Sequence, residues 1–161
     1  MLVENTKKRK LYAPISGNAT GLSKVNDSMF NSGMMGDGVA IIPKTKTIVA
    51  PCDGVVELIA DTKHYIVIKT NDGLGILIHL GLDTVEMNGN GFECFVEQGQ
   101  EVNIGDKIID MDLDKIKDMD LDNVVLIVMF PQREKFSITG ISEGECVAGK
   151  TEIWQYKNIG S

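Results

Sequence analysis

The chain has 161 residues, 43% apolar and 24% charged, an ordinary composition for a single globular domain. Sixteen lysine and arginine residues stand against 23 aspartate and glutamate residues, which leaves a net charge of -7. This acidic balance opposes sequence-independent attraction to phosphate backbones and to anionic lipid. We therefore expect no nucleic acid partner.

The N-terminus is basic and has no apolar segment after it. Lysine and arginine occupy positions 7–10, and we expect a flexible basic tail over residues 1–10 followed by one domain over residues 11–161. No stretch resembles a signal peptide or approaches membrane-spanning length, which predicts a cytoplasmic protein without stable membrane insertion. The three cysteines are far apart and odd in number, so we interpret them as packing residues of a reducing compartment: Cys52, Cys94 and Cys146.

Short apolar segments separated by turn dipeptides predict many brief strands and little helix. Two short helices are expected, over Lys24–Phe30 and Leu113–Leu121. The predicted strands in chain order are Val39–Ile42, Ile48–Val49, Val55–Ile59, Tyr65–Ile68, Gly75–His79, Glu93–Val96, Lys107–Ile109, Val124–Met129 and Glu152–Tyr156. This pattern indicates an all-β sandwich or barrel.

Candidate chemistry centres on the two histidines of the chain, His64 and His79. The turn signal Asp72-Gly73 separates a strand that begins at Tyr65 from one that begins at Gly75, which predicts a hairpin. In that hairpin His79 lies opposite Tyr65 or the two residues before it. Both imidazoles would then be neighbours at the open end of the hairpin, where binding residues commonly emerge from a rigid scaffold.

Strand alternation assigns His79 to one face of the hairpin with Leu77 and Gly81, whereas Ile78 and Leu80 belong to the other face. Residue pattern alone leaves two interpretations open. A histidine at a strand end is often a hydrogen-bonded, half-buried structural residue. Two converging histidines with a nearby glycine are equally compatible with a reactive site.

The run GILIHLGLDTV over residues 75–85 resembles the active-site signature of the glucose-type IIA proteins of the bacterial sugar phosphotransferase system. Further blocks resemble the same family in the same order, so the resemblance covers about residues 11–157. These blocks are GDGVAI at 36–41, APCDG at 50–54, DTKH at 61–64 and EQGQ at 97–100.

The resemblance implies an antiparallel β-sandwich or barrel with jelly-roll-like character, of the duplicated hybrid type, with one or two short helices. It also implies a phosphoryl carrier, a phosphotransferase component in which His79 takes the phosphate. His64 would support transfer, Thr62 would orient His64, and the backbone carbonyl of Gly81 would hold His79. A fixed tautomer would present the Nε2 lone pair of His79 outward as an in-line nucleophile.

The partners that the resemblance implies are proteins: the phosphocarrier HPr as donor and the cysteine of a IIB domain of a sugar permease as acceptor. The docking face implied by alignment comprises Phe30, Met34, Met35, Val85 and Asp83. A role in the core is the alternative for the apolar members of this set, and for Val85 the two interpretations are equally supported.

Three other functions are alternatives to phosphate carriage. A regulatory binding module would dock on metabolic targets when the chain is unphosphorylated. Phosphate carriage requires no cofactor. In the docked state, however, the resemblance allows a zinc ion shared by His64, His79 and a carboxylate of the partner. A zinc hydrolase of related β architecture typically needs an H-x-H pair and a further histidine, so with two histidines Asp or Glu would have to complete the zinc site, which is uncommon. A biotinyl or lipoyl domain would need a lysine in a hairpin motif, which is missing.

Overall fold

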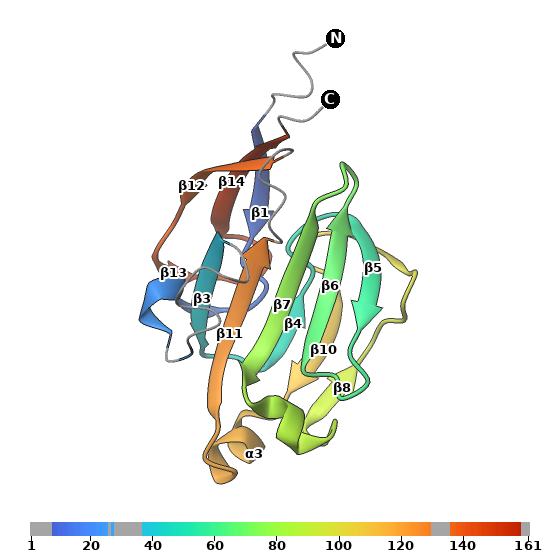
Figure 1. The fold of residues 1–161 in the computed structure, drawn as a ribbon, viewed down its shortest axis with the longest axis vertical. Helices are drawn as coiled ribbons and strands as arrows, with labels where there is room; N and C mark the ends of the chain where they lie inside the picture. Colours follow the sequence, from blue (N-terminus) through green and yellow to red (C-terminus); the bar gives the residue numbers. More distant parts are fainter. Residues whose placement is uncertain (1–7, 26, 28–36, 130–135, 159–161) are drawn as a thin grey trace.

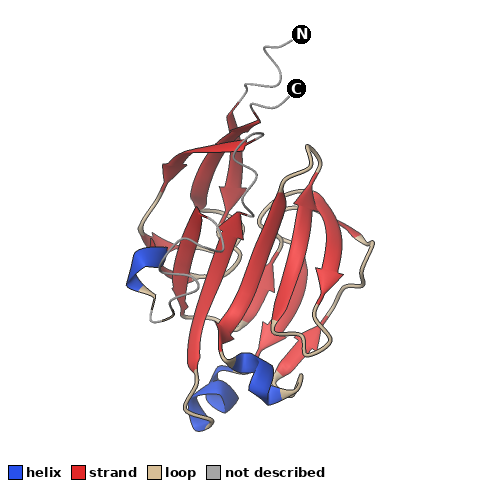
Figure 2. Cartoon of the chain, viewed as in Figure 1, coloured by secondary structure: helices blue, strands red, loops and turns tan. Residues whose placement is uncertain are grey.

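The computed structural model describes residues 8–25, 27, 37–129 and 136–158. Strands form most of this part of the chain, and helices are short (Figure 2). The elements are β1 Lys8–Tyr12, β2 Gly17–Gly21, η1 Leu22–Lys24, β3 Asp37–Pro43, β4 Thr47–Val49, β5 Gly54–Ile59, β6 Tyr65–Thr70, β7 Gly75–Leu82, η2 Thr84–Met87, β8 Phe92–Cys94, β9 Glu101–Val102, β10 Lys107–Met111, α3 Leu113–Asp118, β11 Asp122–Met129, β12 Phe136–Ile141, β13 Gly144–Cys146 and β14 Glu152–Asn158.

The strands form one eight-stranded sheet and two three-stranded sheets (Figure 1). The large sheet has the order β13-β2-β3-β11-β7-β6-β5-β9, and the small sheets have the orders β4-β10-β8 and β1-β14-β12. All of these pairings are antiparallel. The predicted antiparallel β-sandwich is therefore confirmed.

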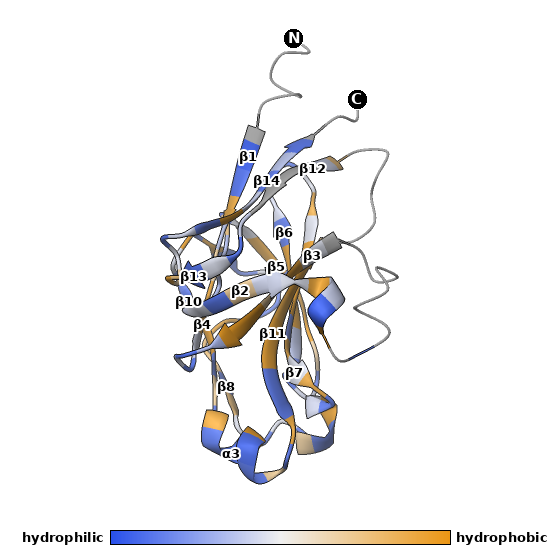
Figure 3. Cartoon of the chain, turned by 90° about the vertical axis from the view of Figure 1, so that its left-hand side faces the viewer, coloured by the Kyte–Doolittle hydropathy of each residue, from blue (hydrophilic) through white to orange (hydrophobic). Residues whose placement is uncertain are grey.

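Strand β11 lies at the centre of the large sheet and is apolar along most of its length (Figure 3). Its buried residues alternate between two apolar clusters, as the strand period requires. Val125 and Ile127 belong to the main core, which also contains Trp154 and Leu11. The second cluster, which we call the outer cluster, consists of Leu22, Val25, Ala40, Val67, Leu77, Leu82, Val124, Leu126 and Val128, with Tyr65 packed against it.

All nine predicted strands exist, and most extend further than expected. The predictions missed β1, β2, β9, β12 and β13. Strand β2 shows why: its sequence GNATG is typical of a turn, but β3 pairs with it on one side and β13 on the other. At Gly17 a Cβ atom would lie 2.1 Å from the carbonyl oxygen of Ile42, so this glycine permits the close pairing.

The N-terminal helix prediction is wrong in the described residues. Only the 3-10 turn η1 forms, and Val25 already has the extended conformation with φ -78 and ψ 137. Most of the predicted helix after Val25 lies outside the described residues. The second predicted helix exists as α3, which Asp112 begins by accepting a hydrogen bond from the backbone N–H of Lys115.

The predicted flexible tail is wrong for residues 8–10, because these residues belong to β1 and pair with β14. The ammonium group of Lys10 lies 2.8 Å from the carboxylate of Glu152, an ion pair that a sequence pattern cannot predict. Residues 1–7 lie outside the described residues. No helix in the described part of the chain is long and apolar enough to cross a bilayer. The cysteines are free; Cys52 and Cys146 are buried, as predicted.

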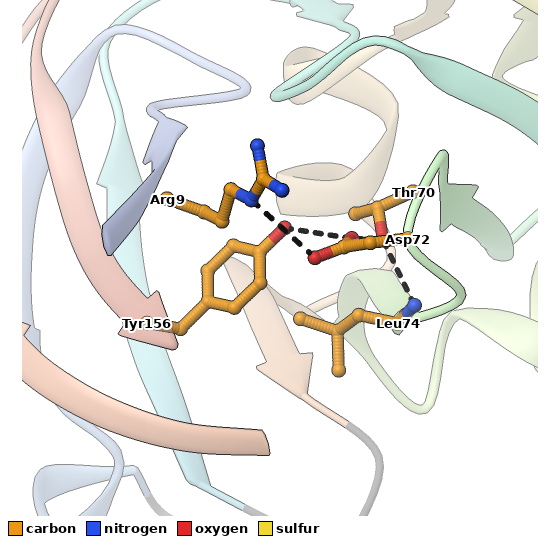
Figure 4. Close-up of polar contacts among 5 residues, drawn as sticks. All are labelled: Arg9, Thr70, Asp72, Leu74 and Tyr156. Atoms are coloured by element: carbon orange, nitrogen blue, oxygen red, sulfur yellow. Dashed lines mark hydrogen bonds and ion pairs between the residues drawn. The ribbon is translucent and has the colours of Figure 1, made fainter. Parts of the chain in front are cut away.

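A polar cluster connects the turn of the β6–β7 hairpin to the terminal strands (Figure 4). Oδ1 of Asp72 accepts hydrogen bonds from the hydroxyls of Thr70, at 2.5 Å, and Tyr156, at 3.2 Å. Oδ2 lies 3.7 Å from Nε of Arg9. The Thr70 hydroxyl in turn accepts from the backbone N–H of Leu74 at 2.8 Å. Asp72 thus fixes the closed end of the hairpin whose open end carries the histidines.

Candidate active site

The β6–β7 hairpin positions His79 as its sequence predicts. Tyr65 is the Cα partner of His79 in the antiparallel pair, and the register continues without a bulge through the hairpin. The alternation along β7 is also confirmed. Ile78 and Leu80 enter the main core, whereas Leu77 belongs to the outer cluster. His79 therefore lies on the outer face of the large sheet, beside the outer cluster.

The imidazole of His79 is held by the backbone two residues further along the chain. Its Nδ1 lies 2.7 Å from the carbonyl oxygen of Gly81. A carbonyl oxygen only accepts hydrogen bonds, so Nδ1 is the protonated nitrogen. In the neutral ring the lone pair is consequently on Nε2, which is the atom suited to nucleophilic attack.

Gly81 adopts a backbone conformation that side chains disfavour, with φ +80. A Cβ atom there would lie 2.6 Å from the carbonyl oxygen of Asp122 and 2.6 Å from Cγ2 of Thr84. The buried hydroxyl of Thr84 donates to the carbonyl of Leu80 at 2.5 Å. These constraints fix the Gly81 peptide, and with it the acceptor for His79.

His64 reaches the same site from the turn that precedes β6. Lys63 has a positive φ of 62, and its N–H closes the turn on the carbonyl of Ala60 at 2.9 Å. Because His64 stands before the first residue of the strand, strand alternation does not force its side chain to the face opposite Tyr65. Nδ1 of His64 lies 2.6 Å from the hydroxyl of Thr62, as the predicted pairing requires.

Three rings meet at the open end of the hairpin. The centroids of His64 and His79 are 5.3 Å apart with an interplanar angle of 85°. Tyr65 is stacked on His79, at 6.2 Å and 10°, and meets His64 edge-on, at 5.0 Å and 85°. The structure therefore brings both predicted histidines together and adds a tyrosine to them.

Both histidines favour their neutral forms. Burial lowers the pKa of His64 and is the largest influence on His79, whose pKa is also lowered. The hydrogen bond to Gly81 and the carboxylates of Asp27 and Asp83 act against this decrease in the pKa of His79. A positive charge on one imidazole would disfavour a charge on the other. A neutral imidazole at neutral pH is the form that can act as a nucleophile.

The predicted docking face is described only in part. Val85 is 48% exposed on η2, which argues against a core position for it. Asp83 is exposed and precedes η2 with a positive φ of 59. Phe30, Met34 and Met35 lie outside the described residues.

Two further residues belong to the site and were missed as site residues. The predicted hairpin gives Tyr65 as one of three residues that could lie opposite His79, but no motif in the sequence marks it as a site residue. Asp27 influences the pKa of His79 from a segment about fifty residues away in sequence, and no local pattern marks it. Only the tertiary structure brings its carboxylate near the imidazole.

One cavity among the described residues lies apart from the two histidines. It has a volume of about 620 Å³ and lies between β8, β10 and the start of α3, with Lys46, Glu93 and Asp110 among its lining residues. Among the described residues, no group of three or more His, Cys, Asp and Glu side chains is placed to hold a metal ion. The two histidines alone would thus be an incomplete metal site.

Comparisons with known proteins agree with this geometry. Residues 9–135 match the family model described as phosphoenolpyruvate-dependent sugar phosphotransferase system, EIIA 1. The structure is similar to that of the glucose permease IIA from Mycoplasma capricolum, with a TM-score of 0.86 and 36% sequence identity over 92% of this chain and 96% of that one. The chain belongs to the glucose-type EIIA family and is a phosphoryl carrier of the sugar phosphotransferase system.

Proposed function

We propose that His79 is the residue that carries the phosphoryl group, which it accepts from phosphorylated HPr and passes to the cysteine of a IIB domain. The hydrogen bond between Nδ1 of His79 and the Gly81 carbonyl carries this proposal, because it leaves the Nε2 lone pair for attack. Family membership supports HPr and IIB partners in general. A relay that starts from HPr also supports a cytoplasmic protein.

The chemical step requires no base. The lone pair on Nε2 of His79 forms the new N–P bond, and the electron pair of the breaking P–N bond returns to the donor imidazole. The proton on Nδ1 stays in place, so the phosphorylated ring of His79 carries a positive charge. The Gly81 carbonyl and the carboxylates of Asp27 and Asp83 stabilise that charge, the same groups that raise the pKa of His79.

His64 has a different role in this proposal. Phosphoryl transfer through a loose transition state needs charge stabilisation on the phosphoryl oxygens. If the Thr62 hydroxyl donates to Nδ1 of His64, the Nε2 of His64 carries a proton and can donate to such an oxygen. His64 would then act mainly when the phosphate passes between proteins.

Incubation with ³²P-labelled phospho-HPr tests the assignment. We expect acid-labile label on His79 of the wild-type chain and none on His79→Ala. His64→Gln should still accept label but transfer it poorly to a IIB domain, so the two variants serve as controls for each other. Label on His79→Ala would contradict the assignment.

The second candidate function is a regulatory role for the unphosphorylated protein. We propose that zinc binds to the histidines only at the interface with a docked partner. The two imidazoles lie within 5.3 Å of each other, centroid to centroid, and supply only two ligands, so a partner carboxylate would have to complete the site. Equilibrium dialysis should show stoichiometric zinc only when a docked target is present. Pull-downs with phosphorylated and unphosphorylated protein should differ. Stoichiometric zinc on the chain alone would contradict the shared site.

A further inference from the structure

The pairing of β6 with β7 places the side chains of Tyr65 and His79 side by side across the hairpin. The backbone N–H of Leu80 donates to the carbonyl of His64 at 2.7 Å, so this pair is hydrogen-bonded. Along an antiparallel ladder the hydrogen-bonded and non-hydrogen-bonded pairs alternate, and side chains are closer in the latter. Tyr65 and His79 are the next pair and thus the non-hydrogen-bonded one.

The three rings constrain one another. Tyr65 and His79 are parallel within 10°, whereas His64 is inclined by 85° to both. These arrangements and their centroid distances of 5.0 to 6.2 Å are the ones that aromatic pairs prefer. Tyr65 also packs against the outer cluster, so its own ring has a fixed support.

The hydrogen bond at Nδ1 does not by itself determine the plane of the His79 imidazole. The bond from Nδ1 of His79 to Gly81 fixes one atom of the ring but permits the ring plane to tilt about it. The Nε2 lone pair lies in the ring plane, so a tilt redirects the attack. The stacked ring of Tyr65 restricts this tilt.

We propose that Tyr65 is a positioning residue for phosphoryl transfer: its ring fixes the plane of the His79 imidazole and the edge-on approach of His64. This inference rests on the proposed function, since it takes His79 as the residue that accepts phosphate. In-line transfer is sensitive to orientation, and loss of one aromatic contact should reduce the rate roughly three- to ten-fold.

Three variants test separately what the Tyr65 ring, its hydroxyl and apolar packing contribute to the rate of phosphoryl transfer. Tyr65→Phe keeps the ring, and Tyr65→Leu removes it but retains apolar volume. Val67→Ala is the matched control, because Val67 lies on the same face of β6, two residues further along, and belongs to the outer cluster. The rate of labelling from phospho-HPr is measured over a range of donor concentrations.

We expect Tyr65→Phe and Val67→Ala to accept phosphate at close to the wild-type rate. Tyr65→Leu should lose three- to ten-fold in maximal rate at a nearly unchanged KM. Equal maximal rates for Tyr65→Leu and the wild type would overturn the inference. A higher KM at an unchanged maximal rate would assign Tyr65 to partner docking. A reduced maximal rate for Tyr65→Phe would assign the role to the hydroxyl. Either result contradicts a positioning role for the ring.

Nuclear magnetic resonance of the unphosphorylated protein gives a readout that needs neither phosphate transfer nor a stable Tyr65→Leu variant. In the wild type and Tyr65→Phe, the His79 ring protons should show ring-current shifts from the stacked ring. Histidine ¹⁵N signals should show the Nδ1-protonated tautomer of His79 that the Gly81 carbonyl requires. Unshifted ring protons in the wild type would overturn the inference. Absence of label on His79 with these shifts intact would instead refute the proposed function.

Discussion

His79 donates a hydrogen bond from Nδ1 to the carbonyl oxygen of Gly81, at 2.7 Å, and this links the chemistry of the site to the backbone conformation of the end of β7. The carbonyl has this position because Gly81 has φ +80 and because no side chain separates it from Asp122. A change of backbone at this residue should thus affect both folding and phosphate acceptance.

Gly81→Ala should lower the free energy of unfolding by roughly 2 kcal/mol and reduce labelling from phospho-HPr, because the new Cβ meets the Asp122 carbonyl. Urea denaturation and labelling rates measure the two effects. Gly105→Ala is the matched control: its φ is +89, but a Cβ there would have no atom within 4 Å. It should have a smaller effect on stability and none on labelling. Equal labelling by both variants would refute the link.

Thr62→Val should separate acceptance of the phosphate from its onward transfer. The hydroxyl of Thr62 lies 2.6 Å from Nδ1 of His64, and valine removes it at constant shape. Loss of one such hydrogen bond corresponds to about a ten-fold decrease in rate. We expect this decrease in the rate of phosphoryl transfer to a IIB domain. Thr62→Ser should retain the wild-type rate. A loss in acceptance by His79 that equals the loss in transfer would contradict the division of roles.

Stability should decrease as the pH falls below the ordinary histidine pKa of about 6.5. Burial lowers the pKa of both His79 and His64 in the folded state, so the unfolded chain binds more protons in the window between the folded values and 6.5. The free energy of unfolding from urea titrations between about pH 7.5 and pH 5.5 measures this slope. His79→Asn should flatten it. A slope that is identical in the variant would show that His79 does not contribute.

Asp72→Ala should lower the free energy of unfolding by about 1–3 kcal/mol, because the buried hydroxyls of Thr70 and Tyr156 lose their acceptor. Asn71→Ala, at the exposed neighbouring position, is the control and should change stability little. A double-mutant cycle with Tyr156→Phe measures the coupling. Labelling of His79 should persist in Asp72→Ala, since the cluster lies at the other end of the hairpin. Loss of labelling in a folded Asp72→Ala protein would contradict this separation.

The sequence predicts the hairpin well because the signals are local. The Asp72-Gly73 turn sets the register, and strand alternation assigns Leu77 and His79 to one face. The same two features place Tyr65 or one of the two residues before it opposite His79, and the structure selects Tyr65. Resemblance to a family then favours a phosphate acceptor over a structural histidine, two interpretations that periodicity left open.

Other features depend on contacts between distant segments, which a local pattern does not contain. Strand β2 has the composition of a turn and becomes a strand because β3 and β13 pair with it on both sides. Residues at 8–10 join β1 because β14 supplies a partner strand. Asp27 affects His79 across about fifty residues of sequence. Turn chemistry and side-chain alternation are local, so the sequence was sufficient to predict the hairpin and the face that carries His79. The exact register, the sheet order, the edge-on approach of His64 and the carboxylate near the site depend on long-range packing, so they emerge only in the folded structure.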